Sequence, residues 1–148
     1  MVIWQRCKKF LQMAPSVSFP VARPKACQHT FGDVTGAERV LICEGWATGA
    51  TLHEATGCPV ICAMNCGNLQ AIVEQFKENH EVMICADDDY RTQQKKGRNP
   101  GLDKATEVAK EFKLRTAIPI FDQRGEGTDF NDLHVACGLD TVRQQIEQ

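Results

Sequence analysis

The chain has 148 residues, of which 43% are hydrophobic, and its formal net charge is -2 at pH 7. This length suits one domain with a real core, and the composition excludes a disordered chain and a strongly basic nucleic-acid coat protein. No run reaches the ~20 apolar residues of a membrane span, and residues 1–10 lack a signal-peptide pattern. We therefore expect a cytoplasmic protein without membrane contact, and any nucleic-acid contact must be local.

Residues 1–38 show no sustained period of a helix or strand and contain several prolines. We interpret them as an N-terminal extension of short strands or coil along a sheet edge, and residues 39–148 as the domain. Residues 39–43 are apolar and predict a buried strand, which Glu44 and Gly45 follow directly. Residues 46–56 predict a helix, because Gly57 and Pro59 form the usual stop.

The same alternation continues along the chain. Residues 59–63 predict a second strand, and Asn68 can cap a helix whose Leu69, Ile72, Val73 and Phe76 share one face. Residues 82–86 predict a third strand, 90–101 a polar loop, 102–112 a helix and 116–121 a fourth strand. A glycine turn and a last helix capped by Asp140 complete the chain. Strand–helix repeats require crossovers, so we predict an α/β fold with a mostly parallel four-stranded sheet flanked by helices.

The chain contains eight cysteines, which raises the alternatives of a zinc site or disulfides. Cys43, Cys62 and Cys85 lie in strand-like runs, where a thiol acts as a small hydrophobic group. The spacing of Cys58, Cys62 and Cys66 does not match a structural zinc site, which leaves zinc as a minor alternative. A cytosolic location argues against disulfides. We therefore expect buried free thiols.

Carboxylates follow three of the four predicted strands. Glu44 comes after the first strand, Asp87 and Asp89 after the third, and Asp129 and Asp132 after the fourth. Because the carboxyl ends of parallel strands open on one edge of a sheet, these side chains are expected to converge. Carboxylate oxygens are ligands that Mg²⁺ prefers, alongside water and substrate phosphates. The pattern therefore favours a magnesium site for phosphate chemistry.

Each of these residues also has a purely structural interpretation. Asp129 can be only a helix N-cap, and Asp88 is expected to be solvated. We expect His53 and His134 to be surface or hydrogen-bonded residues rather than catalysts. Trp46 is expected to pack in the core, with the stacking of a nucleobase as the alternative. Three acidic positions at strand ends nevertheless favour a shared site over three independent caps.

Three motifs together resemble the TOPRIM domain of topoisomerases and primases, which has a Rossmann-like fold. They are residues 40–45 with Glu44, residues 86–89 with Asp87 and Asp89, and residues 129–132 with Asp129. Residues 44–50 together with the Asn99-Pro100-Gly101 run are most similar to primases and primase-helicases of phages, plasmids and integrated elements. The resemblance covers residues 38–147.

The resemblance implies a role for each matching residue. Asp87, Asp89 and Asp129 would hold Mg²⁺, for which Mn²⁺ can substitute, with Asp132 or Asn131 assisting. Glu44 would be the general acid or base near the reacting phosphate. The predicted polar loop would contact phosphate or template through four cations, namely Arg91, Lys95, Lys96 and Arg98. A solvated basic loop is the alternative for these four.

The resemblance implies a primase-type nucleotidyltransferase domain that acts in DNA replication of a mobile element. Its partners would be a single-stranded DNA template, nucleoside triphosphates and a helicase domain or protein. A TOPRIM nuclease and a non-catalytic metal- or nucleotide-binding fragment are the alternatives. Strand passage is disfavoured because the only tyrosine, Tyr90, adjoins the metal motif. Primases of this family carry further modules that are not recognised here, so we expect an excised domain or a truncated gene product.

Overall fold

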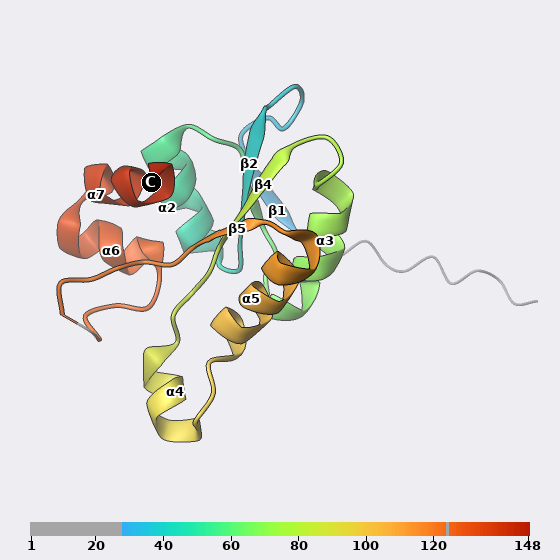
Figure 1. The fold of residues 1–148 in the computed structure, drawn as a ribbon. Helices are drawn as coiled ribbons and strands as arrows, with labels where there is room; N and C mark the ends of the chain where they lie inside the picture. Colours follow the sequence, from blue (N-terminus) through green and yellow to red (C-terminus); the bar gives the residue numbers. More distant parts are fainter. Residues whose placement is uncertain (1–27, 124) are drawn as a thin grey trace, which may run out of the picture.

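The computed structural model describes residues 28–123 and 125–148, which form a central sheet with helices on both faces (Figure 1). In the described residues the strands are β1 (His29–Phe31), β2 (Arg39–Cys43), β3 (Val60–Cys62), β4 (Glu81–Cys85) and β5 (Arg115–Ala117). Their order across the sheet is β1-β3-β2-β4-β5. β1 pairs with β3 in antiparallel orientation, whereas the other pairs are parallel. The sheet is therefore mixed, with β2 at its centre between β3 and β4.

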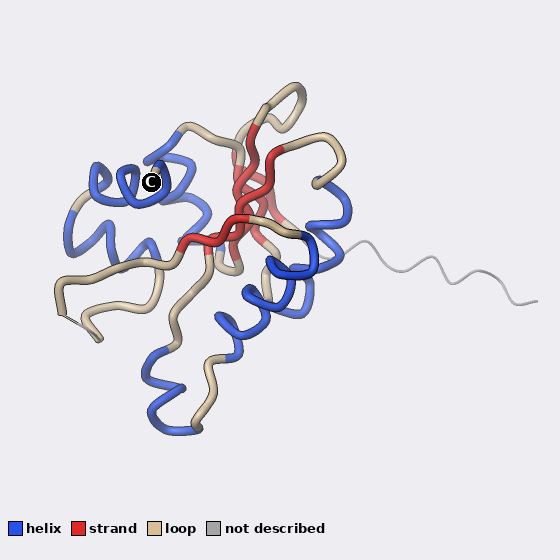
Figure 2. The backbone as a smooth tube through the Cα atoms, in the orientation of Figure 1, coloured by secondary structure: helices blue, strands red, loops and turns tan. Residues whose placement is uncertain are grey.

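Helices cover the two faces of the sheet in separate groups (Figure 2). One face packs against α2 (Trp46–Thr56), α6 (Phe130–Cys137) and α7 (Leu139–Glu147), and the other against α3 (Leu69–Phe76) and α5 (Pro100–Phe112). Alternation along β2 explains this division, because Val40 and Ile42 belong to one buried cluster and Leu41 and Cys43 to the other. The short 3-10 helix η1 (Cys66–Asn68) precedes α3, and α4 (Tyr90–Lys96) lies apart from the sheet.

Several predictions from the sequence are confirmed. The α/β fold class holds, and β2 and α2 have the predicted bounds. The four apolar residues predicted to share a face of α3 are all buried: Leu69, Ile72, Val73 and Phe76. Asn68 is at the N-cap position of α3, but its side chain makes no capping hydrogen bond. Cys43, Cys62 and Cys85 are buried free thiols, as expected. The sheet has one strand more than predicted, because β1 pairs along its edge.

Three local predictions were wrong. The stretch from Tyr90 to Lys96 is helix α4 rather than loop, because its residues are good helix formers but show no apolar periodicity. β5 ends at Ala117, well before residue 121, since Pro119 has no N–H for a ladder and Ile120 bonds Gln145 instead. Asp140 lies in the first turn of α7 and does not cap it.

The prediction for residues 1–27 falls outside the described part of the chain. Within that part, none of the helices combines the length and apolar character required to cross a membrane.

Gly49 sets how closely α2 approaches the sheet. A Cβ at this position would overlap Cys62 Sγ and lie 3.2 Å from Phe31 Cε2 and 3.3 Å from Cys43 Sγ. Helices usually disfavour glycine, by ~1 kcal/mol relative to alanine. The close packing of α2 on β2 and β3 therefore explains why glycine occupies the middle of this helix.

We predict that Gly49→Ala lowers the free energy of unfolding by about 1–2 kcal/mol, because overpacking outweighs the gain in helix propensity. Urea unfolding measures this loss. The matched test is the same change in a Cys62→Ala background, which removes the closest atom. An equal loss in both backgrounds would contradict the assignment of the cost to this contact.

Candidate active site at the carboxyl edge of the sheet

Glu44 and Asp87 lie side by side because β2 and β4 are neighbours in the sheet. Cys43 and Cys85, the last residues of these strands, are paired in register; Glu44 follows Cys43 directly, and Asp87 follows Cys85 after Ala86. From β2 the chain continues to β3 on one side, and from β4 it continues to β5 on the other. Such a reversal of direction marks the point at which open α/β sheets bind ligands. The sheet order thus selects this edge as the candidate site.

The predicted acidic residues come together around Asp87. Burial raises the pKa of Asp87 to about 7, with further contributions from the negative charges of Glu44, Asp129, Asp89 and Asp132, in that order. Burial and the charge of Asp89 likewise raise the pKa of Glu44 above its ordinary value. The acidic residues predicted from the sequence therefore all lie close enough to Asp87 to raise the pKa of its carboxyl group.

Two carboxylate oxygens in this cluster are buried without a hydrogen-bond partner, namely Glu44 Oε1 and Asp87 Oδ1. A buried acceptor left unpaired is costly, and a cation or a proton would compensate it. The donor set consists of carboxylates, which suits Mg²⁺. No three acidic, histidine or thiol side chains of the described residues are already gathered as ligands around one point. The residues fit a divalent cation through their chemistry and unpaired oxygens.

Asp129 and Asp132 organise the start of α6. Asp129 is its N-cap and accepts a bond from the Asp132 N–H at 2.8 Å. Asp132 Oδ2 accepts bonds from the N–H and hydroxyl of Thr128 at 2.8 and 3.3 Å. Asn131 Oδ1 accepts from Thr51 Oγ1 of α2 at 3.1 Å. The capping interpretation is therefore correct for Asp129, and it leaves the second oxygen of each carboxylate for other contacts.

Asn99 holds the acidic turn after β4 in place and was not recognised as a site residue from the sequence. It is 1% exposed, and its Nδ2 donates to Asp88 Oδ1 at 2.7 Å. Its Oδ1 accepts from the N–H groups of Asp89 at 3.2 Å and Leu102 at 3.4 Å, so it also caps α5. The signal for this role was the Asn-Pro pair at the start of a helix. Asp88 is half-buried and bonded to Asn99, so the expectation of a solvated Asp88 was wrong.

The other residues considered from the sequence lie outside the acidic cluster or at the protein surface. The four cations predicted to contact phosphate, Arg91, Lys95, Lys96 and Arg98, are exposed on α4 or just after it. None of them forms an ion pair with another described residue. His53 Nδ1 lies 2.8 Å from the Cys58 carbonyl oxygen, as expected for a hydrogen-bonded residue, and His134 is half-buried on α6. Trp46 is 54% exposed, so its expected place in the core was wrong.

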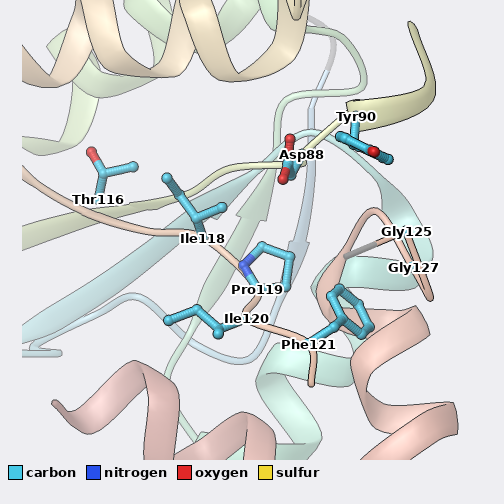
Figure 3. A pocket seen from close by; sticks show the side chains of 9 residues that line it. All are labelled: Asp88, Tyr90, Thr116, Ile118, Pro119, Ile120, Phe121, Gly125 and Gly127. Atoms are coloured by element: carbon cyan, nitrogen blue, oxygen red, sulfur yellow. The ribbon is translucent and has the colours of Figure 1, made fainter. Parts of the chain in front are cut away.

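A cavity of about 550 Å³ lies beside the acidic turn after β4 (Figure 3). Asp88 and Tyr90 line it from the segment after β4, and the segment after β5 supplies an apolar wall that includes Ile120 and Phe121. The N–H of Asp88 donates to the Thr128 carbonyl oxygen at 2.7 Å, which ties the two segments together. Asp88, the neighbour of Asp87 and Asp89 in the chain, is therefore the carboxylate through which the cavity adjoins the turn after β4.

We predict that Asp87→Asn stabilises the metal-free protein, and more so as the pH rises. Since the folded-state pKa of about 7 lies above the ordinary value of 3.8, the folded protein keeps this proton after the unfolded chain has lost it. The wild type therefore loses stability from about pH 4 to pH 7. At pH 8 the gain should reach about 2–4 kcal/mol. Urea unfolding with EDTA at several pH values measures it.

The control is Asp140→Asn, whose aspartate has a side chain that is 90% exposed. It should change the free energy of unfolding by less than about 0.5 kcal/mol. A gain from Asp87→Asn that does not grow with pH would show that burial among carboxylates is not its cause.

Gly101 is the second residue that the sequence did not mark for the site. A Cβ at this position would lie 2.8 Å from Glu44 Oε1. We predict that Gly101→Ala displaces the Glu44 carboxylate toward water and returns its pKa toward the ordinary value, because burial is the main cause of the shift. Carboxyl-carbon NMR titration measures this, with Thr106→Ala on the same helix as control. An unmoved Glu44 titration would refute the prediction.

Comparison with known proteins shows the family to which this domain belongs. The family model of the Toprim domain matches residues 39–140. Two proteins from Escherichia coli named DNA primase TraC are 38% and 31% identical to the chain over 106 residues, which is 68% of this chain. The match spans only 10% and 7% of the length of these relatives. No solved structure matches the chain. The chain belongs to the Toprim domain family and is similar to part of proteins named DNA primase.

Proposed function

We propose that residues 39–148 are the Mg²⁺-dependent catalytic domain of a DNA primase-like protein, in which they transfer nucleotides during the replication of a mobile element. The observation that carries the proposal is the convergence of Glu44, Asp89, Asp129 and Asp132 on the half-buried Asp87 carboxyl group. The similarity to proteins named DNA primase supports the reaction class.

Asp87, Asp89 and Asp129 would hold the cation, with Asp132 or Asn131 assisting. Asp87 Oδ1 is unpaired, and its carboxyl group gives up its proton when a cation offsets the surrounding negative charge. When bound, Mg²⁺ supplies charge neutralisation at the phosphate oxygens and a template that orients them. Mn²⁺ would substitute for it.

Glu44 is the residue that we propose for proton transfer. Its raised pKa brings its proton exchange closer to neutral pH, which favours general acid–base catalysis. Gly101 lets the backbone of α5 approach Glu44 Oε1 closely and limits the access of water to that oxygen. The Glu44 carboxyl group is therefore positioned to take a proton from an attacking hydroxyl or to return one to a leaving group.

The surroundings of the acidic cluster suit a nucleotide substrate. The cavity of about 550 Å³ next to Asp88 leaves room for it, and the apolar wall after β5 suits a ring system. The cations on and after α4, namely Arg91, Lys95, Lys96 and Arg98, would contact phosphates of the triphosphate or of the template strand. A helicase domain or protein would supply the unwound template.

We predict that Asp87→Asn weakens Mn²⁺ binding at least about tenfold, or ~1.4 kcal/mol. Asp88→Asn should change it less than about twofold, because the amide oxygen can still accept the bond from Asn99. Isothermal titration at pH 7.5 measures both affinities. Equal losses from the two variants would contradict the assignment of Asp87 as a ligand and Asp88 as a turn residue.

Catalysis is tested by template-directed synthesis of labelled oligoribonucleotides, with the chain alone and within any longer protein that contains it. Asp87→Ala and Glu44→Ala should both abolish product, since they remove a ligand and the proton-transfer group. Absence of synthesis in every context would overturn the proposal. Mg²⁺-dependent loss of labelled DNA without synthesis would instead support the nuclease alternative.

A further inference from the structure

Trp46 is a large aromatic side chain held at the surface beside the acidic cluster. It is 54% exposed and begins α2, two residues after Glu44. The first turn of α2 contains no acidic residue, and no side chain caps it. Single exposed apolar side chains are common on protein surfaces. Trp46 differs from them because it lies two residues from Glu44 and packs on other aromatic rings.

The Trp46 ring is supported from the protein side by other aromatic rings. Its centroid lies 5.3 Å from that of Phe31 and 6.2 Å from that of His29, both on β1. Phe31 in turn stacks on His53 at 6.3 Å with an interplanar angle of 22°. β1 places His29 opposite Cys62, at the same sheet edge as the acidic cluster. The ring is thus held in position on one side and open to solvent on the other.

Met64 adds a second exposed apolar side chain next to Glu44. It is 48% exposed, and its N–H donates to the Glu44 carbonyl oxygen at 2.9 Å. Its φ of 64° is in the left-handed region, which is costly for methionine and persists where the surroundings impose it. The backbone of Glu44 is therefore flanked by two apolar side chains that face water.

We propose that Trp46, together with Met64 bonded to the backbone of Glu44, forms a platform on which a nucleobase of single-stranded DNA stacks. Aromatic rings bind unpaired bases of any sequence in this way. The uncapped N–H groups of α2 favour a phosphate next to the stacked base. A protein partner is less well matched, because two exposed apolar side chains close to a carboxylate residue do not make the apolar centre of a stable protein interface.

The platform lies on the β3 side of the acidic cluster, and the cavity lined by Asp88 lies on the β5 side. A template base on Trp46 and a nucleotide in the cavity would therefore approach the carboxylates from opposite sides. The identity of the strand as a template rests on the proposed function, but binding of the strand to Trp46 does not.

The fluorescence of Trp46 tests the platform directly. The chain has two tryptophans, so Trp4→Phe leaves Trp46 as the only one. Titration with a thymidine 15-mer in EDTA should quench its emission, and quenching should be weak with a duplex of the same length because its bases are already stacked. EDTA removes any dependence on metal or catalysis, so this result stands or falls separately from the proposed function.

Substitutions at Trp46 give the second test. Trp46→Ala should weaken binding of a labelled 15-mer about tenfold, and Trp46→Phe should restore most of the affinity, because a smaller ring still stacks. Val135→Ala is the matched control, since Val135 is 80% exposed on α6 and lies outside the platform. Equal affinity of Trp46→Ala and wild type overturns the proposal. Concentration-dependent self-association that shields Trp46 without DNA also overturns it.

Discussion

Burial of the Asp87 carboxyl group among four other carboxylates is the interaction on which the rest of this structure depends. Alone it would destabilise the fold, since burial and like charges both favour the protonated acid and hold its pKa near 7. Glu44 Oε1 and Asp87 Oδ1 remain unpaired in the same place. Such a local loss of stability is typical of a functional site, where the binding of a ligand restores the lost stability.

The packing around Asp87 holds the carboxylates together despite their repulsion. Two hydrophobic clusters on opposite faces anchor β2 and β4, so the ends of these strands cannot separate to relieve the repulsion. Asn99 holds the turn after β4 through its contacts with Asp88 and Asp89, and Gly49 and Gly101 let helices approach closely. The chemistry is therefore preorganised by packing and hydrogen bonds rather than by the carboxylates themselves.

The local sequence was informative wherever one residue pattern decides one element. The apolar run of β2 and the stop signals after α2 predicted both elements with their bounds, and the carboxylates after the strands predicted the acidic edge. Prediction failed where the pattern was silent or ambiguous. α4 is polar all round, β5 is shortened by Pro119, and Trp46 reads as a core residue although its ring lies in water.

The sequence by itself determined that strands and helices alternate, that acidic residues follow the strands, and that the chain has the motifs of the Toprim family, because these are properties of neighbouring residues. Only the tertiary structure decided that β2 lies beside β4, so that Glu44 meets Asp87 from 43 positions away. It also decided that Asn99 is buried against Asp88 and that Trp46 faces solvent. Strand order and exposure depend on contacts between distant segments, which no local pattern encodes.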